Sequence, residues 1–116
     1  MGAESPKLPA AVVVHAASII VHQSQAADYL KHVHNTLLPA YRAANGMIAV
    51  CFSRRELLAY VEILAVSTWL SEEALRKFAP ETMSPDEMNA RGFIALEPHM
   101  YELVASYCGR GSFEEQ

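Results

Sequence analysis

The sequence has few cysteines and no excess of positive charge. Only Cys51 and Cys108 occur in 116 residues, and neither has a second ligand at a C-x-x-C spacing. Neither a metal site nor a disulfide framework is therefore expected, and both thiols fit a reducing compartment. Nine Lys and Arg stand against 13 Asp and Glu, giving a net charge of −4. This balance gives no attraction to phosphate backbones, so we expect no nucleic-acid partner.

Long hydrophobic runs are also missing. No segment reaches the roughly 18 uninterrupted apolar residues that a membrane helix needs. The apolar segment Ala10–Val21 is preceded only by Lys7 after an acidic Glu4, and His15 interrupts it. A cleavable signal peptide has a basic start instead. We interpret the segment as a buried strand and expect a soluble, cytoplasmic protein without a membrane partner.

The hydrophobic fraction of 52% is enough for a real core, and the length leaves room for one domain. Residues 1–9 are polar with two prolines and are expected to form a flexible arm. Residues 10–108 are expected to form the domain, and residues 109–116 a flexible tail.

The first half of the domain predicts a strand and a long helix. Val12–Val21 is apolar on both faces, which predicts a strand covered on both sides. Ser24 can act as the N-cap of the following helix, which Asn45-Gly46 would end. Pro39 removes a backbone donor inside this helix and predicts a kink. One apolar stripe recurs at three- and four-residue steps: Ala26, Leu30, Val33, Leu37, Tyr41 and Ala44.

The second half predicts a hairpin, two helices and a last strand. Met47–Phe52 and Leu57–Thr68 favour strands joined by a turn through residues 53–56. Ser71 is the expected N-cap of a helix, and the capping box Ser84–Glu87 opens a shorter one that ends at Gly92. Residues 98–107 favour a final strand.

The order β-α-β-β-α-(α)-β is typical of a ferredoxin-like α+β domain with an antiparallel sheet. Helices would cover one face of that sheet only. Because the strands are apolar on both faces, a second copy of the sheet is the simplest cover for the other face. We therefore expect a two-fold homodimer.

Three segments resemble the antibiotic biosynthesis monooxygenase family. Val21–Gly46 is similar to its first strand end and long helix, Trp69–Leu75 to its aromatic-x-S-x-E-A-L signature, and His99–Val104 to its closing strand. The resemblance covers about residues 12–107, poorly from Ala79 to Leu96. It implies a dimeric α+β barrel with a pocket in each subunit between sheet and helices.

The resemblance leaves several activities open. Some family members are cofactor-free monooxygenases of phenolic or quinol-like aromatics, others degrade haem, and others have no assigned activity. The haem-degrading branch carries an Asn where this sequence has Ala17, and a His in a helix that here, in residues 71–83, contains none. Haem binding or degradation is thus the least favoured of these.

A cofactor-free oxygenase needs a base, hydrogen-bond donors for an anion and a dry pocket. We therefore single out two groups of residues. The candidate catalytic residues are His15, His34 and Tyr101. The candidate substrate-binding residues are Trp69, Ser67, Tyr41 and His99.

Structural roles compete with these functional ones. Trp69 could be a core residue that fastens a strand to a helix, and His15 a core histidine satisfied by one backbone bond. His99 and Tyr101 share a strand face that could lie at the dimer interface. The sequence therefore predicts a cofactor-independent monooxygenase of a small aromatic molecule, with a non-catalytic small-molecule-binding or structural homodimer as the alternative.

Overall fold

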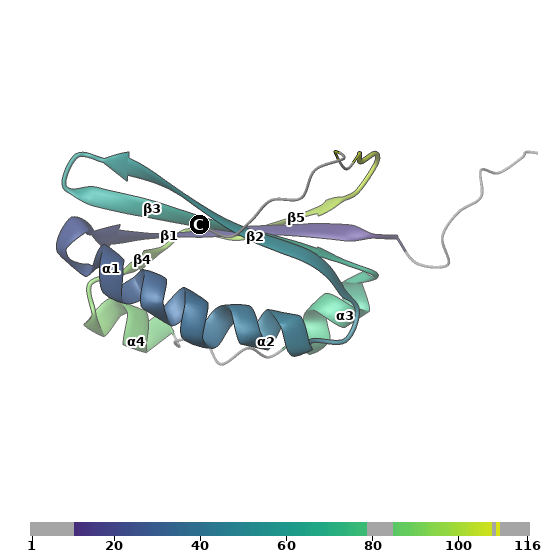
Figure 1. The fold of residues 1–116 in the computed structure, drawn as a ribbon, viewed down its shortest axis with the longest axis horizontal. Coiled ribbons are helices and arrows are strands. Elements are labelled where there is room, and N and C mark those ends of the chain that lie inside the picture. The colour runs from purple at the N-terminus through teal and green to yellow at the C-terminus, as the bar shows by residue number, and fades with distance from the viewer. Residues whose placement is uncertain (1–10, 79–84, 108, 110–116) are drawn as a thin grey trace, which may run out of the picture.

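A computed structural model describes residues 11–78, 85–107 and 109, which form one antiparallel sheet with helices on one face (Figure 1). Its central strands are β1, Val13–His22, and β3, Tyr60–Trp69. The sheet order is β2-β3-β1-β4, and β5 also pairs with β1. This arrangement confirms the predicted ferredoxin-like α+β fold. The proposed 1–9 arm and most of the 109–116 tail lie outside the described residues.

The long helix is one continuous element with a wider turn in its middle. It comprises α1, Gln23–His32, the π-helical η1, Val33–Leu37, and α2, Leu38–Ala43. Pro39 cannot donate a backbone hydrogen bond to the preceding turn, so the irregularity predicted there takes the form of a π turn. After α2, Gly46 has a φ of +85°, as the predicted glycine stop requires.

The start of this helix differs from the prediction. His22, not Ser24, is the N-cap, because the Nδ1 atom of His22 accepts the backbone N–H of Ser24 at 3.1 Å. The hydroxyl of Ser24 lies 2.9 Å from the same nitrogen. The imidazole therefore takes the place that a serine oxygen was expected to fill.

The predicted hairpin is present, but its turn is misplaced. Strand β2 runs from Met47 to Leu57 and the turn is Leu58-Ala59, not residues 53–56. The charged residues instead belong to an edge strand, where the Nε of Arg55 donates to the Oε1 of Glu62 at 2.9 Å across the strand pair. The polar composition of residues 53–56 predicted a loop. That prediction was wrong because edge strands tolerate exposed charges as well as loops do.

Two short helices follow. Helix α3, Glu72–Lys77, has Ser71 as its predicted N-cap, since the Ser71 hydroxyl accepts the Ala74 N–H at 3.1 Å. Helix α4, Pro85–Ala90, is followed by Gly92 with a φ of +80°. The expected cap Ser84 lies outside the described residues.

The last strand begins earlier than predicted and is interrupted. Strands β4, Ile94–Ala95, and β5, His99–Glu102, both pair with β1, but their registers differ by one residue. Pro98 lies at the interruption, where its missing N–H breaks no ladder. Residues 103–107 are not strand.

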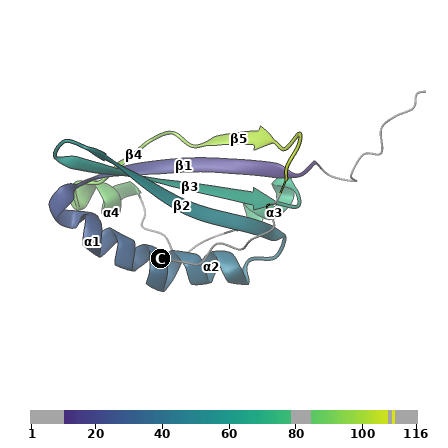
Figure 2. The ribbon, with the colours of Figure 1, turned by 45° about the horizontal axis from the view of Figure 1, so that its top comes forward.

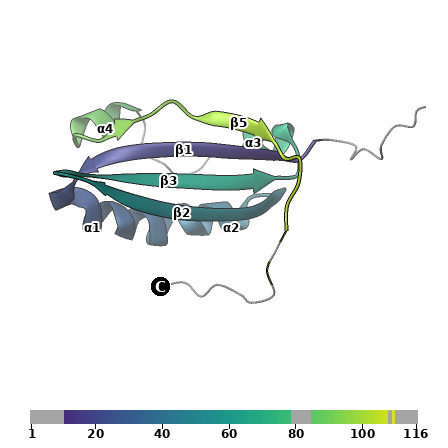
Figure 3. The ribbon, with the colours of Figure 1, turned by 90° about the horizontal axis from the view of Figure 1, so that it is seen from above.

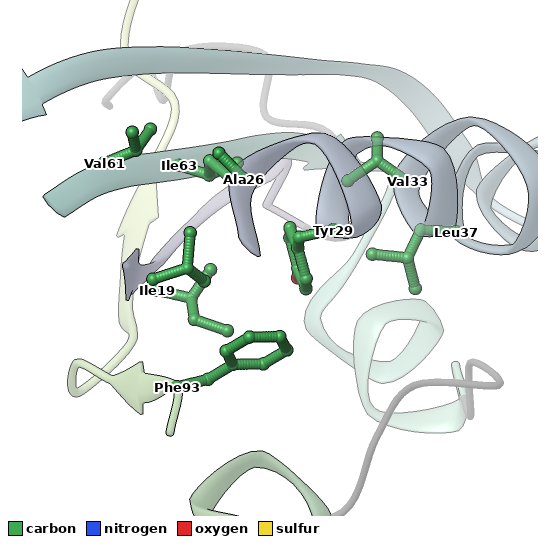
Figure 4. Close-up of a cluster of buried hydrophobic side chains, with 9 residues drawn as sticks. Ile19, Ala26, Tyr29, Val33, Leu37, Val61, Ile63 and Phe93 are labelled. Atoms are coloured by element: carbon green, nitrogen blue, oxygen red, sulfur yellow. The ribbon is translucent and has the colours of Figure 1, made fainter. Parts of the chain in front are cut away.

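The core lies between the sheet and the part of the long helix from Ala26 to Leu37 (Figure 4). The ring of Tyr29 meets that of Phe93 edge to face at 5.5 Å between centroids. The predicted apolar stripe faces this core. Buried members of the cluster are Ile19, Val21, Ala26, Tyr29, Val33, Leu37, Val61, Ile63 and Phe93.

The opposite face of the sheet is not covered by helices in the described part of the chain (Figures 2 and 3). We call it the outer face. It carries apolar side chains along β1 and β3, among them Leu64, which is 36% exposed, and the exposed Tyr101 lies beside them on β5. None of the described helices is both long and apolar enough to cross a membrane.

Candidate functional site

An apolar cavity of about 480 Å³ lies between the sheet and the helices. His15, Ala17 and Ile19 of β1 form its sheet side, together with Ala65 of β3. These residues alternate along one strand face, and that face is the one that meets the helices. Leu37 and Tyr41 reach the cavity from the long helix.

A second recess of about 700 Å³ lies at the surface between the end of α2 and α3. Small residues such as Ala43 and Ala74 make up much of its wall, and its charged residues Glu73 and Lys77 pair with each other at 3.4 Å. No histidine or tyrosine of the described residues lines it. Helix α3 and the turn before β2 approach each other closely here. Gly46 permits this contact, because a Cβ at that position would collide with Ala74. The inner cavity is therefore the better candidate for chemistry.

His15 is the histidine that reaches the cavity. It is half-buried, and burial lowers the pKa of its imidazole below 6.5. At neutral pH the ring is therefore neutral and one nitrogen can accept a proton. Within the described ranges no side-chain hydrogen bond holds this ring, so both nitrogens are available to a ligand.

Tyr41 supplies a second polar group on the same cavity. Burial raises the pKa of its phenol, and a side-chain hydrogen bond with Ser67 opposes part of that rise. The phenol is thus protonated at neutral pH and can donate. Tyr29, whose pKa is raised first by burial and then by Tyr41, also lines the cavity.

Ser67 and Trp69 stand behind the cavity wall. Trp69 is fully buried, and its indole Nε1–H donates to the Oγ of Ser67 at 2.9 Å. Its ring packs on those of Tyr41 and Phe78, at 6.2 and 5.0 Å between centroids. The structure therefore places these two predicted substrate-binding residues one layer behind Tyr41 rather than on the cavity.

Aromatic rings that sequence reasoning did not single out complete the wall. Phe52 of β2 and Phe78 after α3 both line the cavity and pack against Tyr41, at 5.9 and 4.7 Å between ring centroids. Met88 of α4 and Pro98, which lies between β4 and β5, also line it. An aromatic residue directly after a capped helix was a signal that could have pointed to Phe78.

The remaining predicted residues lie elsewhere. His34 belongs to η1 and is exposed. His99 and Tyr101 pair with Ala16 and Val14 of β1, whose side chains point away from the helices. Their rings lie 6.3 Å apart on the outer face. The structure does not bring these three residues to the cavity.

No three His, Cys, Asp or Glu side chains of the described residues gather as metal ligands. Among the described residues, the cavity offers His15 as a proton acceptor and tyrosines as donors in an apolar surrounding. Such a site can bind a flat, uncharged ring and take a proton from a hydroxyl on it.

Comparison with known proteins supports the fold. The chain superimposes with a TM-score of 0.59 on a crystal structure from Bacillus cereus, assigned provisionally as an antibiotic biosynthesis monooxygenase. The alignment covers 85% of this chain and 99% of that one, at 15% identity. The chain therefore has the fold of that family. No protein-family model and no curated protein matches the sequence.

Proposed function

We propose that the protein is a cofactor-independent monooxygenase that oxidises a small phenolic or quinol-like aromatic molecule. The observation that carries the proposal is His15, neutral and without a side-chain partner in the described ranges, on an otherwise apolar cavity of about 480 Å³. The wall of the cavity is mostly apolar, which favours a neutral base of this kind. The provisional assignment of the Bacillus cereus protein of the same fold supports the same activity.

The reaction can be written without a cofactor. His15 would take a proton from the substrate, and the electron-rich anion would reduce molecular oxygen to a carbon-bound hydroperoxide. Loss of water from the hydroperoxide leaves a carbonyl. For anthrone, the ring CH₂ and O₂ give C=O and H₂O, so one oxygen atom enters the product. All four electrons come from the substrate carbon.

Oxygen uptake by the EDTA-treated protein tests this proposal. The substrates are anthrone and a panel of dihydroanthraquinone-type compounds, with formation of the carbonyl product followed by absorbance. His15→Gln is expected to lower kcat by about 100-fold or more, the usual effect of losing a general base. Comparison with His34→Gln separates the two candidate bases. No product from any member of the panel would refute the proposal.

A binding protein without catalysis is the second candidate. It is favoured by the absence of any described side chain that orients the His15 ring, since catalytic imidazoles are usually held by a third group. Saturable binding of the same aromatics without oxygen uptake would establish it. A Soret band on addition of haem would indicate a haem protein instead.

We also propose that the protein acts as a homodimer. The outer face carries apolar side chains on neighbouring strands, and a second copy of the same face is self-complementary about a two-fold axis. Covering it would bury the partly exposed Leu64 and the exposed Tyr101. Each subunit would keep its own cavity, because the cavity opens on the other side of the sheet.

A further inference from the structure

One residue borders both the inner cavity and the surface recess. Phe78 lines the cavity of about 480 Å³ and also the recess of about 700 Å³. Among the described residues it is the one that the two walls share. The recess lies where the end of α2 and α3 adjoin each other, at one end of the helix layer (Figure 1). Phe78 therefore belongs to the partition between the two spaces.

The two helices contribute different faces to the two spaces. On α2, Tyr41 lines the cavity and Ala43 lines the recess. On α3, Leu75 lines the cavity and Ala74 lines the recess. Neighbouring positions on a helix point about 100° apart, so the helices themselves make up most of the partition. Phe78 follows α3 directly, and its ring closes the partition where that helix ends.

Aromatic contacts on the cavity side hold this ring in place. Its centroid lies 4.7 Å from that of Tyr41 and 5.0 Å from that of Trp69. The backbone N–H of Phe78 donates to the carbonyl of Leu75 at 3.0 Å, which fixes the point at which the chain leaves the helix. The residue is only half-buried, because it also meets the recess. Loss of the ring would therefore join the cavity to the recess.

The two spaces offer different surroundings to a ligand. The cavity has mostly apolar walls, which favour burial of a flat ring system. The recess lies at the surface, where the exposed Glu73 and Lys77 pair at 3.4 Å. A molecule too long for the cavity could extend into the recess only through the position that the Phe78 ring occupies.

We propose that Phe78 limits the length of the aromatic molecules that the cavity accepts. With the ring in place, a molecule must fit within the cavity. Without the ring, one further fused ring of the molecule can extend into the recess. Phe78 is thus a specificity-determining residue that touches one end of the ligand. The inference rests on the proposed function in that the cavity must hold a small aromatic molecule, and it adds a limit on the size of that molecule.

Anthrone and 5(12H)-tetracenone test this limit, because the second compound is anthrone with a fourth fused ring. Neither compound is oxidised in the absence of oxygen, so binding alone is measured. Trp69 is the only tryptophan in the chain and packs on Phe78, so quenching of its fluorescence reports binding. The wild type is expected to bind anthrone about 10-fold or more tightly than tetracenone, the scale on which pockets reject a group that does not fit. Phe78→Ala is expected to remove this preference by binding tetracenone more tightly.

Phe52→Ala is the matched control, because Phe52 lines the cavity and packs on Tyr41 but does not line the recess. It removes the same kind of ring without joining the two spaces, so the preference for anthrone is expected to persist. Ala43→Phe fills the recess from outside the cavity, since Ala43 is exposed. It is expected to leave wild-type binding unchanged and to restore the preference for anthrone when combined with Phe78→Ala.

The possible results separate the two proposals. If anthrone binds but Phe78→Ala keeps the wild-type preference, or Phe52→Ala loses it equally, the length limit is refuted while aromatic binding stands. Equal binding of both compounds by the wild type refutes the limit as well. If neither compound binds to the wild type or to Phe78→Ala, the proposed function fails and this inference with it. Should Phe78→Ala fail to fold, Phe78→Leu shortens the side chain and is expected to lower the preference in the same direction.

Discussion

His15 and Ser67 face each other across two neighbouring strands, on the side of the sheet that meets the helices. Neither residue would define a site alone, since one is an isolated histidine and the other a buried serine. The register joins them, and Ser67 in turn accepts the indole N–H of Trp69, whose ring packs on Tyr41. The polar end of an otherwise apolar cavity is thus set by strand pairing.

Stability is expected to fall on acidification from pH 7.5 to 5.5. Burial lowers the pKa of His15 below 6.5, and burial together with the charge of Arg91 lowers that of His32. Below pH 6.5 the unfolded chain therefore binds more protons than the folded one, and the free energy of unfolding decreases until the lowered pKa is passed. Above pH 6.5 this contribution is fully present.

Urea midpoints at the two pH values measure the effect. His15→Gln is expected to lose less stability than the wild type over the same interval, with His34→Gln as a control for composition. Equal losses in His15→Gln and the wild type would show that burial of His15 does not contribute.

Replacement of Trp69 by Phe is expected to lower the free energy of unfolding by about 2 kcal/mol. The change removes the bond to Ser67 and leaves a small void among Tyr41 and Phe78. Urea denaturation followed by far-UV circular dichroism measures it. The neighbouring Leu70 is 57% exposed, so Leu70→Ala is expected to stay within about 0.5 kcal/mol of the wild type. Equal losses in both variants would contradict the packing described here.

Gly46→Ala is expected to destabilise more than Gly92→Ala. Both glycines have a positive φ, which costs a side chain about 1 to 2 kcal/mol. Only at Gly46 would the new Cβ lie 2.7 Å from that of Ala74, whereas at Gly92 the nearest atom is 3.9 Å away. The difference between the two denaturation free energies therefore isolates the contact with α3. The loss of stability caused by Gly46→Ala should be smaller in a chain that already carries Ala74→Gly than in the wild type.

Leu64→Glu is expected to convert a dimer into a folded monomer. Leu64 lies on the outer face, 36% exposed, so the charge does not enter the core of the subunit. In the proposed dimer it would be buried without a partner. Analytical ultracentrifugation at micromolar concentration measures the change, with Leu70→Glu on the helix side as a matched control. A wild-type chain that is monomeric and stably folded would refute the dimer.

The layout of the fold was predictable from hydrophobic patterns and caps. The apolar stripe of the long helix, the cap at Ser71 and the glycine stop at Gly46 are all found. The hairpin turn was not predictable, because Leu58-Ala59 contains none of the usual turn residues, although Leu58 has a φ of +54°. The interruption of the last strand likewise depends on its pairing with β1, which a single strand does not reveal.

The site was predictable only in part. The alternation of His15 with Ala17 indicated a shared face, but both faces of that strand are apolar, so composition could not tell which one meets the helices. Phe52 and Phe78 come from separate elements and reach Tyr41 only through packing. His99 and Tyr101 were expected to share one strand face, at the pocket or at a dimer interface, and a single strand does not reveal which. The register shift before His99 puts both side chains on the outer face.

The π turn at Val33–Leu37 has a bearing on any shortened or lengthened form of this chain. Each helical residue rotates the next by about 100°. A π turn holds about one residue more than an α turn, so deleting one residue there would leave the later side chains near their present angles, whereas a deletion between Tyr29 and Val33 would swing them by about that angle. In the second case Tyr41 would leave Phe52 and the cavity, while Ala26 and Tyr29 would keep their places. The wide turn is an angular spacer that aligns two halves of one helix with different parts of the sheet.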